Sequence, residues 1–327
     1  MQSRSQFWKI YALGGGLGHL HRSLALGRAA TSKGHSVQVL TNSRFANHIP
    51  WKNELGNHGS VKVINHKDSL DRTKEKALRW IKEEGYDRLI IDTLPRGIGG
   101  ELKGVLDSIT KKKVLVQRDL NPDYMDTYKI NEFVQKYNLI IVPGETDYTR
   151  SVQRMKQSHS TKPWLIRDCN EILGRVKARS LLGMDLMDKR SLAIISCTGR
   201  SDEEHSFLQI KKELISSLPD WCFKVSSPIP GIGDISPWPL MELMNGIDMI
   251  IGSGGYNTVN EIRATSTPFR ARPLTRMYDR QSKRLKKTET YTSIQKLKEA
   301  LRATGTRSSC QDFQNGAHKA VNLIEEE

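Results

Sequence analysis

The stretch from Ile250 to Glu261, Ile-Ile-Gly-Ser-Gly-Gly-Tyr-Asn-Thr-Val-Asn-Glu, constrains the fold of this chain most strongly. Its apolar start is typical of the end of a buried strand, and residues 258–264 have the apolar spacing of an amphipathic helix. Between them, Gly252, Gly254 and Gly255 permit a tight turn and a close backbone approach. Because a helix N-terminus presents N–H groups, such a turn can hold a phosphate. The same residues could equally form a strand-to-helix turn that binds nothing, and this stretch alone leaves both interpretations open.

A second strand, glycine turn and helix lie near the start of the chain. Residues 7–13 are apolar, Gly14 to His19 is rich in glycine, and an amphipathic helix is expected to end near Lys33. A strand over 37–40 then completes a βαβ unit, which implies a parallel sheet. The same alternation continues, with strands expected at 61–64, 88–92, 113–117 and 139–143 and helices at 73–84, 101–110 and 131–137. This pattern predicts a doubly wound α/β domain whose ligands lie beyond the carboxyl ends of the strands.

The length of 327 residues indicates two domains rather than one. The strand and helix rhythm breaks between Thr161 and Lys189, and a second series begins with an apolar strand at 192–196. We therefore predict an N-terminal domain over 1–162, a linker over 163–190 and a C-terminal domain over 191–327. The last helix could pack back on the N-terminal domain.

Three motifs in this order resemble those of one protein family. Residues Gly14 to Leu26 are similar to the loop GG-x-G-H-x-x-R-x-L-A-L of GT-B glycosyltransferases, particularly those related to the bacterial UDP-N-acetylglucosamine transferase that forms lipid II. Residues Gly252 to Glu261 resemble the donor-nucleotide signature of the same family, and Asp279-Arg280-Gln281 follows at the expected distance. The resemblance spans most of the chain and implies an α/β fold of the GT-B type, with two Rossmann-like doubly wound parallel-sheet domains facing a central cleft.

The resemblance also implies where a UDP-sugar would bind. The C-terminal domain would hold the donor and the N-terminal domain an acceptor of unknown identity. Backbone N–H groups after the apolar strand that ends at Ile251 would bind the diphosphate, Glu261 the ribose hydroxyls, and Asp279 and Gln281 the sugar hydroxyls. The residues of the two glycine loops assigned to the donor in this way are Gly15, Gly16, Gly18, Ser253, Gly254, Gly255, Tyr256 and Asn257. Because a helix N-terminus stabilises a leaving diphosphate by itself, this chemistry needs no metal.

One loop departs from the family pattern. Relatives carry a glycine-serine loop after the first strand of the second domain, whereas this chain has Ser196-Cys197-Thr198-Gly199-Arg200. Thr198 and Arg200 are the side chains there that could contact a phosphate, and a solvated arginine is an equally good interpretation of Arg200.

His19 is the candidate catalytic base. Transfer to a hydroxyl requires removal of a proton, and histidine accepts a proton near neutral pH. A histidine that only packs against its turn is the alternative, and we favour a functional role because His19 matches the histidine of the family loop. Arg22, Asp92 and Asp119 are weaker candidates for binding the acceptor or orienting His19, since acids at strand ends often only cap helices or turns.

Several other classes of protein are disfavoured by what the sequence lacks. The four cysteines occur singly and there is no Asp-x-Asp motif, so no metal site is predicted. The strand ending at Asn42 carries no acid for a dinucleotide ribose, and neither glycine loop is followed by a P-loop lysine. NAD- or FAD-binding and ATPase functions are therefore not expected, and no cofactor is expected besides the donor substrate.

Much of the net charge of +15 lies between Arg263 and Arg307, where thirteen Lys or Arg face three acids. Such a segment could contact an anionic membrane surface or a phosphorylated substrate, or simply be a solvated helix face. Few aromatic residues interrupt it, so nucleic acid is not expected as a partner. No apolar run is long enough for a signal or membrane helix. We expect a cytoplasmic protein, with peripheral contact at the inner face of the membrane through residues 263–307.

Together these features predict a metal-independent, inverting glycosyltransferase. It would move a hexose or N-acetylhexosamine from a UDP-sugar to an acceptor hydroxyl, and the basic segment suggests a lipid-linked or phosphorylated acceptor. Two alternatives remain open at this point: a GT-B UDP-sugar 2-epimerase, and a subunit that binds a nucleotide sugar without turnover. The sequence identifies neither the sugar nor the acceptor.

Overall fold

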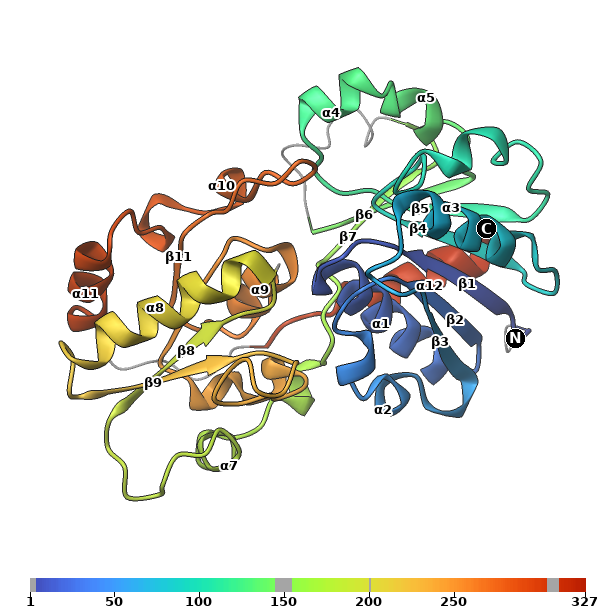
Figure 1. Ribbon diagram of the computed structural model, residues 1–327. Coiled ribbons are helices and arrows are strands. Elements are labelled where there is room, and N and C mark those ends of the chain that lie inside the picture. Colours follow the sequence, from blue (N-terminus) through green and yellow to red (C-terminus); the bar gives the residue numbers. More distant parts are fainter. Residues whose placement is uncertain (1–3, 145–154, 200, 305–311) are drawn as a thin grey trace. The chain divides into compact units, whose positions relative to one another are not determined.

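A computed structural model describes residues 4–144, 155–199, 201–304 and 312–327 of the chain (Figure 1). The chain forms two compact units. Unit 1 comprises Met1–Ile166, Met277–Asp279 and Asn315–Glu327, and unit 2 comprises Arg167–Arg276 and Arg280–Gln314. Each unit is built on its own parallel sheet, which confirms the predicted pair of parallel-sheet α/β domains.

The sheet of unit 1 has seven parallel strands in the order β3-β2-β1-β4-β5-β6-β7. Its inner strands are buried on both faces, as is usual when helices cover both sides of a parallel sheet, so they read as nearly continuous apolar runs. The strands are β1 Phe7–Ala12, β2 Ser36–Thr41, β3 Gly59–Val63, β4 Arg88–Asp92, β5 Lys112–Val116, β6 Leu139–Pro143 and β7 Ser158–Thr161.

Helices cover both faces of this sheet. On one face, α1 (Leu17–Ser32) packs beside the C-terminal helix α12 (Gly316–Glu326), which Figure 1 draws in red. His35 Nε2 lies 2.6 Å from Glu325 Oε1 and helps to hold α12 there. On the other face, α3 (Leu70–Lys82) buries Trp80 against a core that also includes residues of the short helices α4 (Pro122–Thr127) and α5 (Ile130–Val134). A further short helix, α2 (Trp51–Leu55), contacts α1 and β3.

Two elements of unit 1 differ from the sequence expectation. The helix expected over 101–110 is only a short 3-10 turn, η3 (Glu101–Gly104). There, Glu101 turns its carboxylate inward to accept hydrogen bonds from Tyr11 and from the Gly99 N–H. Strand β7 was not expected, because this edge strand, Ser-His-Ser-Thr, has none of the apolar character of a buried strand.

The sheet of unit 2 has four parallel strands in the order β11-β10-β8-β9. They are β8 Ser191–Ser196, β9 Trp221–Ser226, β10 Met249–Gly252 and β11 Phe269–Ala271. One face packs against α8 (Glu204–Ile215) and α11 (Ile294–Arg302), and the other against α7 (Arg175–Leu181), α9 (Tyr256–Ala264) and the 3-10 helix η6 (Leu240–Gly246). The short helix α10 (Gln281–Arg284) contacts α9.

Each sheet reverses its strand order at one position, and crevices at such positions are the usual ligand sites of open α/β sheets. In unit 1 the reversal lies between β1 and β4, so the loops after Ala12 and Asp92 are neighbours. In unit 2 it lies between β8 and β10, so the loops after Ser196 and Gly252 are neighbours. Both glycine turns that the sequence singles out therefore occupy the position where a ligand is expected.

Candidate functional site

The reversal point of unit 1 holds a cluster of three side chains, of which two are buried and His19 is partly exposed. His19 lies in the first turn of α1, and its Nδ1 is 2.6 Å from Asp92 Oδ2 at the end of β4. Arg22, one turn further along α1, donates from Nε to Asp92 Oδ1 over 2.7 Å and from Nη2 to Asp92 Oδ2 over 2.6 Å. The structure thus brings together three of the residues that the sequence proposes for unit 1.

The environment of Asp92 keeps it ionised. The side chain is only 1% exposed, and this burial raises the pKa of its carboxyl. The Arg22 charge and the His19 hydrogen bond oppose the burial and together bring the pKa down to about 2. An ionised carboxylate only accepts hydrogen bonds, so His19 carries its proton on Nδ1. Nε2 is then the basic nitrogen, and it makes no hydrogen bond within the described residues.

Acid should weaken this cluster measurably. The pKa of Asp92 is lower in the folded chain than the ordinary value of 3.8. The ionised carboxylate therefore contributes its full stabilisation of the fold above pH 3.8, and this contribution is lost as the pH falls through about 2. Wild type should lose stability relative to Asp92→Asn as the pH falls. We expect the difference between their unfolding free energies to be smaller at pH 2 than at pH 6, by about 2 kcal/mol. Denaturant titrations at both pH values measure this. A difference that does not change with pH would contradict the assignment.

Thr93 supports the cluster from an unusual conformation. Its backbone φ is +70°, which a β-branched residue rarely adopts, and its hydroxyl accepts a hydrogen bond of 2.9 Å from Arg22 Nη2. Strained residues of this kind concentrate at functional sites. No pattern in the sequence indicates Thr93, because its role depends on a contact with a residue 71 positions earlier.

Gly14 provides the space in which the His19 ring lies. A Cβ atom at this position would come within 2.3 Å of His19 Cδ2, and the Gly14 N–H is held by Asn42 Oδ1 at 2.7 Å. Gly15, Gly16 and Gly18, the other predicted loop residues, have no atom within 4 Å of such a Cβ, so this side of the loop is open.

Replacement of Gly14 by alanine should therefore displace His19 without unfolding unit 1. We expect Gly14→Ala to lower any activity that depends on His19 by about tenfold or more, because a misplacement of about 1 Å can cost up to 100-fold. Gly104→Ala is the matched control, since its added methyl also meets nothing and Gly104 lies outside the glycine loop. Equal activity of the two variants in a turnover assay would show that the position of His19 is unimportant.

The glycine turn of unit 2 leads directly into α9. Gly255 is the N-cap residue, no side chain caps the helix, and its first turn contains no acid. A helix start of this kind favours an anion through its N–H groups and its dipole. A Cβ atom on Gly255 would meet only Thr258 Oγ1, at 3.9 Å, so a ligand can approach the backbone there.

Two residues behind this turn hold it in shape. Gln281 is buried, and its Oε1 accepts from the Gly254 N–H at 3.2 Å and from the Leu274 N–H at 2.9 Å. Arg284 Nη1 donates to the Gly254 carbonyl over 2.7 Å. The Gln281 oxygen is therefore engaged with backbone rather than turned to a sugar hydroxyl, and Arg284, which the sequence motif did not indicate, places a positive charge beside the turn.

The remaining predicted donor residues of unit 2 are distributed around this turn. Ser253, Asn257 and Thr198 are partly exposed, whereas Tyr256 and Glu261 are buried, Glu261 with only 6% of its surface exposed. Thr198 follows β8, on the loop that neighbours the glycine turn. Arg200 lies outside the described residues.

Asp279 and Gln281, the two predicted sugar ligands, belong to different units. Together with Met277 and Tyr278, Asp279 belongs to unit 1, whereas Gln281 belongs to unit 2. Asp279 Oδ1 lies 3.4 Å from Nη2 of Arg118, which follows β5, and the Tyr278 carbonyl accepts a hydrogen bond of 3.0 Å from the Asn121 N–H. Asp119, the last predicted residue, is buried beside Arg118.

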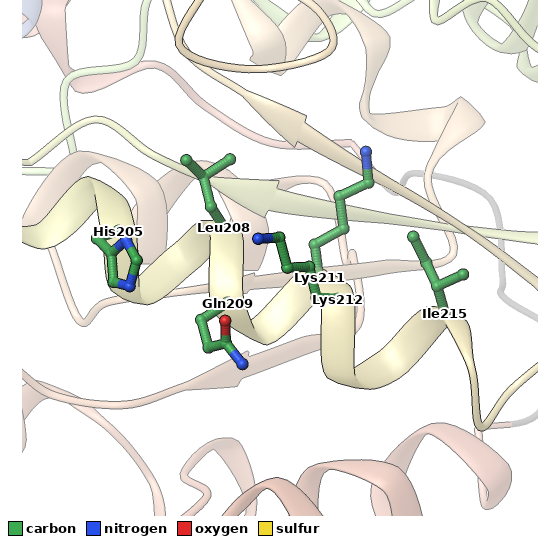
Figure 2. A pocket seen from close by; sticks show the side chains of 6 residues that line it. All are labelled: His205, Leu208, Gln209, Lys211, Lys212 and Ile215. Atoms are coloured by element: carbon green, nitrogen blue, oxygen red, sulfur yellow. The ribbon is translucent and has the colours of Figure 1, made fainter.

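A groove on the outer face of α8 carries none of the predicted site residues. Figure 2 shows its lining side chains, all from α8, which are His205, Leu208, Gln209, Lys211, Lys212 and Ile215. Lys211 is engaged in an ion pair with Asp234.

Within the described ranges, no three His, Cys, Asp or Glu side chains gather closely enough to hold a metal ion.

No family model and no curated protein matches the sequence. Solved structures do match. The glycotransferase of kitacinnamycin is 13% identical, with 99% of each chain covered and a TM-score of 0.61. UGT2 of Phytolacca americana, in complex with UDP-2fluoro-glucose and pterostilbene, is 13% identical over 100% of this chain and 90% of that one, with a TM-score of 0.53. A Listeria monocytogenes protein whose suggested activity is that of a UDP-N-acetylglucosamine 2-epimerase is 9% identical over 82% and 79%, with a TM-score of 0.53.

These likenesses confirm the predicted fold. The chain has the two parallel-sheet α/β domains seen in GT-B glycosyltransferases, at a sequence identity of only 11–13%. Among the described residues, no helix is both long enough and apolar enough to cross a membrane.

Proposed function

We propose that the protein is a glycosyltransferase that moves a sugar from UDP to an acceptor hydroxyl without a metal ion. The observation that supports this most strongly is the pair formed by His19 and Asp92. An ionised carboxylate bonded to Nδ1 fixes the imidazole tautomer and stabilises the imidazolium that forms when Nε2 takes a proton. His19 is 23% exposed, so an acceptor hydroxyl can reach it.

The proposed binding of the donor rests on the glycine turn of unit 2. The N-terminus of α9 and the nearby Arg284 would bind the diphosphate, and they stabilise the negative charge that develops on it as the bond to the sugar breaks. Glu261 would bind the ribose hydroxyls. Direct attack of an acceptor activated by His19 inverts the anomeric carbon, because it is a single displacement. This assignment agrees with the motif resemblance and with the glycosyltransferase structures that share the fold.

Incubation with single UDP-hexoses and UDP-N-acetylhexosamines, followed by measurement of released UDP and of glycosylated product, tests this proposal. The motif likeness to the transferase that forms lipid II makes UDP-N-acetylglucosamine the first donor to try. We expect release of UDP with at least one donor in the presence of a hydroxyl acceptor. A protein that binds no UDP and cleaves no UDP-sugar would overturn the proposal.

A 2-epimerase is the second candidate, because a structure with that suggested activity shares the fold. An epimerase would move a proton on the sugar itself and would need no acceptor. Product analysis in the absence of any acceptor separates the two activities. A new UDP-sugar epimer would favour the epimerase, and tight UDP binding without any product would favour a binding subunit.

We further propose peripheral contact of the basic segment, residues 263–307, with an anionic membrane surface. In its described part, Lys283, Lys286 and Lys287 are exposed, whereas Arg263 pairs with Glu289 and Arg276 with Glu203. Near an anionic surface each exposed lysine contributes about 1 kcal/mol. We expect the protein to sediment with vesicles that contain phosphatidylserine and not with neutral vesicles. Equal partitioning onto both would contradict this contact.

A further inference from the structure

Arg96, which follows β4, is a buried cation whose charge is unmatched. Only 8% of its surface is exposed, and its Nη1 has no hydrogen-bond partner. Its guanidinium forms no ion pair with any carboxylate that the structure describes. The Tyr128 ring lies over the guanidinium, with its centroid 4.2 Å from Cζ. Because a buried, uncompensated charge is strongly destabilising, a cation in this position calls for an anion.

The groups around Arg96 do not supply that anion. Tyr124, Tyr128 and Tyr278 form a ring cluster, with centroids 5.1 Å apart for the first pair and 4.7 Å apart for Tyr124 and Tyr278. Burial and the neighbouring Tyr278 raise the pKa of Tyr124 to about 12, against the opposing effect of Arg96, so this phenol stays neutral. The nearby acid, Glu101, directs its carboxylate at Tyr11 and the Gly99 N–H and makes no ion pair with Arg96.

The local backbone is shaped to admit the guanidinium. Gly100 has a φ of +85°, and a Cβ atom there would lie 2.4 Å from Arg96 Nη2. Arg96 is also only four residues beyond Asp92, on the loop that starts from the strand-order reversal of unit 1. An anion held by Arg96 would therefore lie on the same sheet edge as the His19 and Asp92 pair.

We propose that Arg96 and the tyrosine cluster form a subsite for an anionic group of the acceptor. A carboxylate and a phosphate share the required chemistry, since both accept paired hydrogen bonds from a guanidinium. The phenol rings provide apolar and π contacts for the part of the acceptor that carries the anion. The role of the subsite in acceptor choice rests on the proposed transferase function, whereas the binding of an anion does not.

Calorimetric titration of the full chain with phenyl phosphate, benzoate and phenol tests this subsite. We expect one of the two anions to bind, with Arg96→Gln weakening it at least tenfold and Arg96→Lys at least threefold. Arg79→Gln, which removes the same charge from an exposed position on α3, should change nothing. The affinity for phenol should be the same in the wild type and in all three variants. The stronger of the two anions identifies phosphate or carboxylate as the group recognised.

Two results would overturn the subsite: no binding of either anion to the wild type, or equal anion affinity in wild type and Arg96→Gln. If Arg96→Gln does not fold, equal affinity of Arg96→Lys and wild type overturns it instead. UDP titrated into the same proteins keeps this test separate from the proposed function. If an anion binds in a way that depends on Arg96 but UDP does not bind, the subsite stands and the transferase is rejected. If UDP binds but neither anion does, the subsite is rejected and the transferase stands.

Discussion

Replacement of His19 by alanine is expected to lower sugar transfer by about 100-fold or more while UDP affinity stays within about twofold. The acceptor hydroxyl loses its base, because Nε2 is the nitrogen that the bond from Nδ1 to Asp92 leaves available for a proton. The glycine turn of unit 2, which is proposed to bind the donor, precedes α9 and is untouched by the change. Initial rates at saturating donor, combined with calorimetric titration of UDP, measure the two effects separately.

His58 provides the matched control for this experiment. It is exposed in unit 1, so His58→Ala removes an imidazole without touching the cluster. We expect this variant to keep wild-type activity. Undiminished transfer by His19→Ala would remove His19 from the mechanism, and loss of UDP affinity would instead give it a role in holding the donor.

Replacement of Gly255 by aspartate is expected to weaken UDP binding by at least about tenfold, which corresponds to about 1.4 kcal/mol. The new carboxylate would stand at the N-terminus of α9, where the diphosphate is proposed to bind, and two like charges near a protein surface repel each other by more than that. Aspartate is also a favourable N-cap residue, so the thermal stability should be unchanged or slightly raised. Calorimetry and thermal unfolding of the same preparation measure both quantities.

The matched control is Gly255→Asn, which has nearly the same shape and capping ability without the charge. Little in the protein opposes either side chain, because the nearest atom to an added Cβ is 3.9 Å away. If the turn merely connects β10 to α9, the two variants will bind UDP equally. A weakening confined to the aspartate variant would instead distinguish a phosphate site from a simple turn.

The sheets and the glycine turns at their edges could be predicted from the sequence because the signals are local. Buried parallel strands such as β8 and β10 are uninterrupted apolar runs, and glycines follow β1 and β10 directly. The edge strand β7 and the short turn η3 have no such local signal, so the sequence does not indicate them. The first has no apolar pattern, and the second depends on where Glu101 finds its partners.

The site was predictable only as far as its motifs reach. His19 and Gly255 lie in recognisable loops, but the bond between Asp92 and Arg22 joins residues 70 positions apart, so their grouping needs the fold. Asp279 shows the same limit, because its place in unit 1 and its contact with Arg118 are indicated by no motif. Arg96 belongs to no motif, and only its burial without a counter-charge draws attention to it.

Thermal unfolding of the full chain with a panel of nucleotides and nucleotide sugars tests the central claim most directly. Saturating UDP and at least one UDP-sugar should raise the midpoint by about 5 °C at roughly 100 times the dissociation constant. ADP and GDP should give smaller shifts, and Gly255→Asp should abolish the effect of UDP. The absence of any shift with UDP, or equal shifts with every nucleoside diphosphate, would contradict a UDP-sugar transferase.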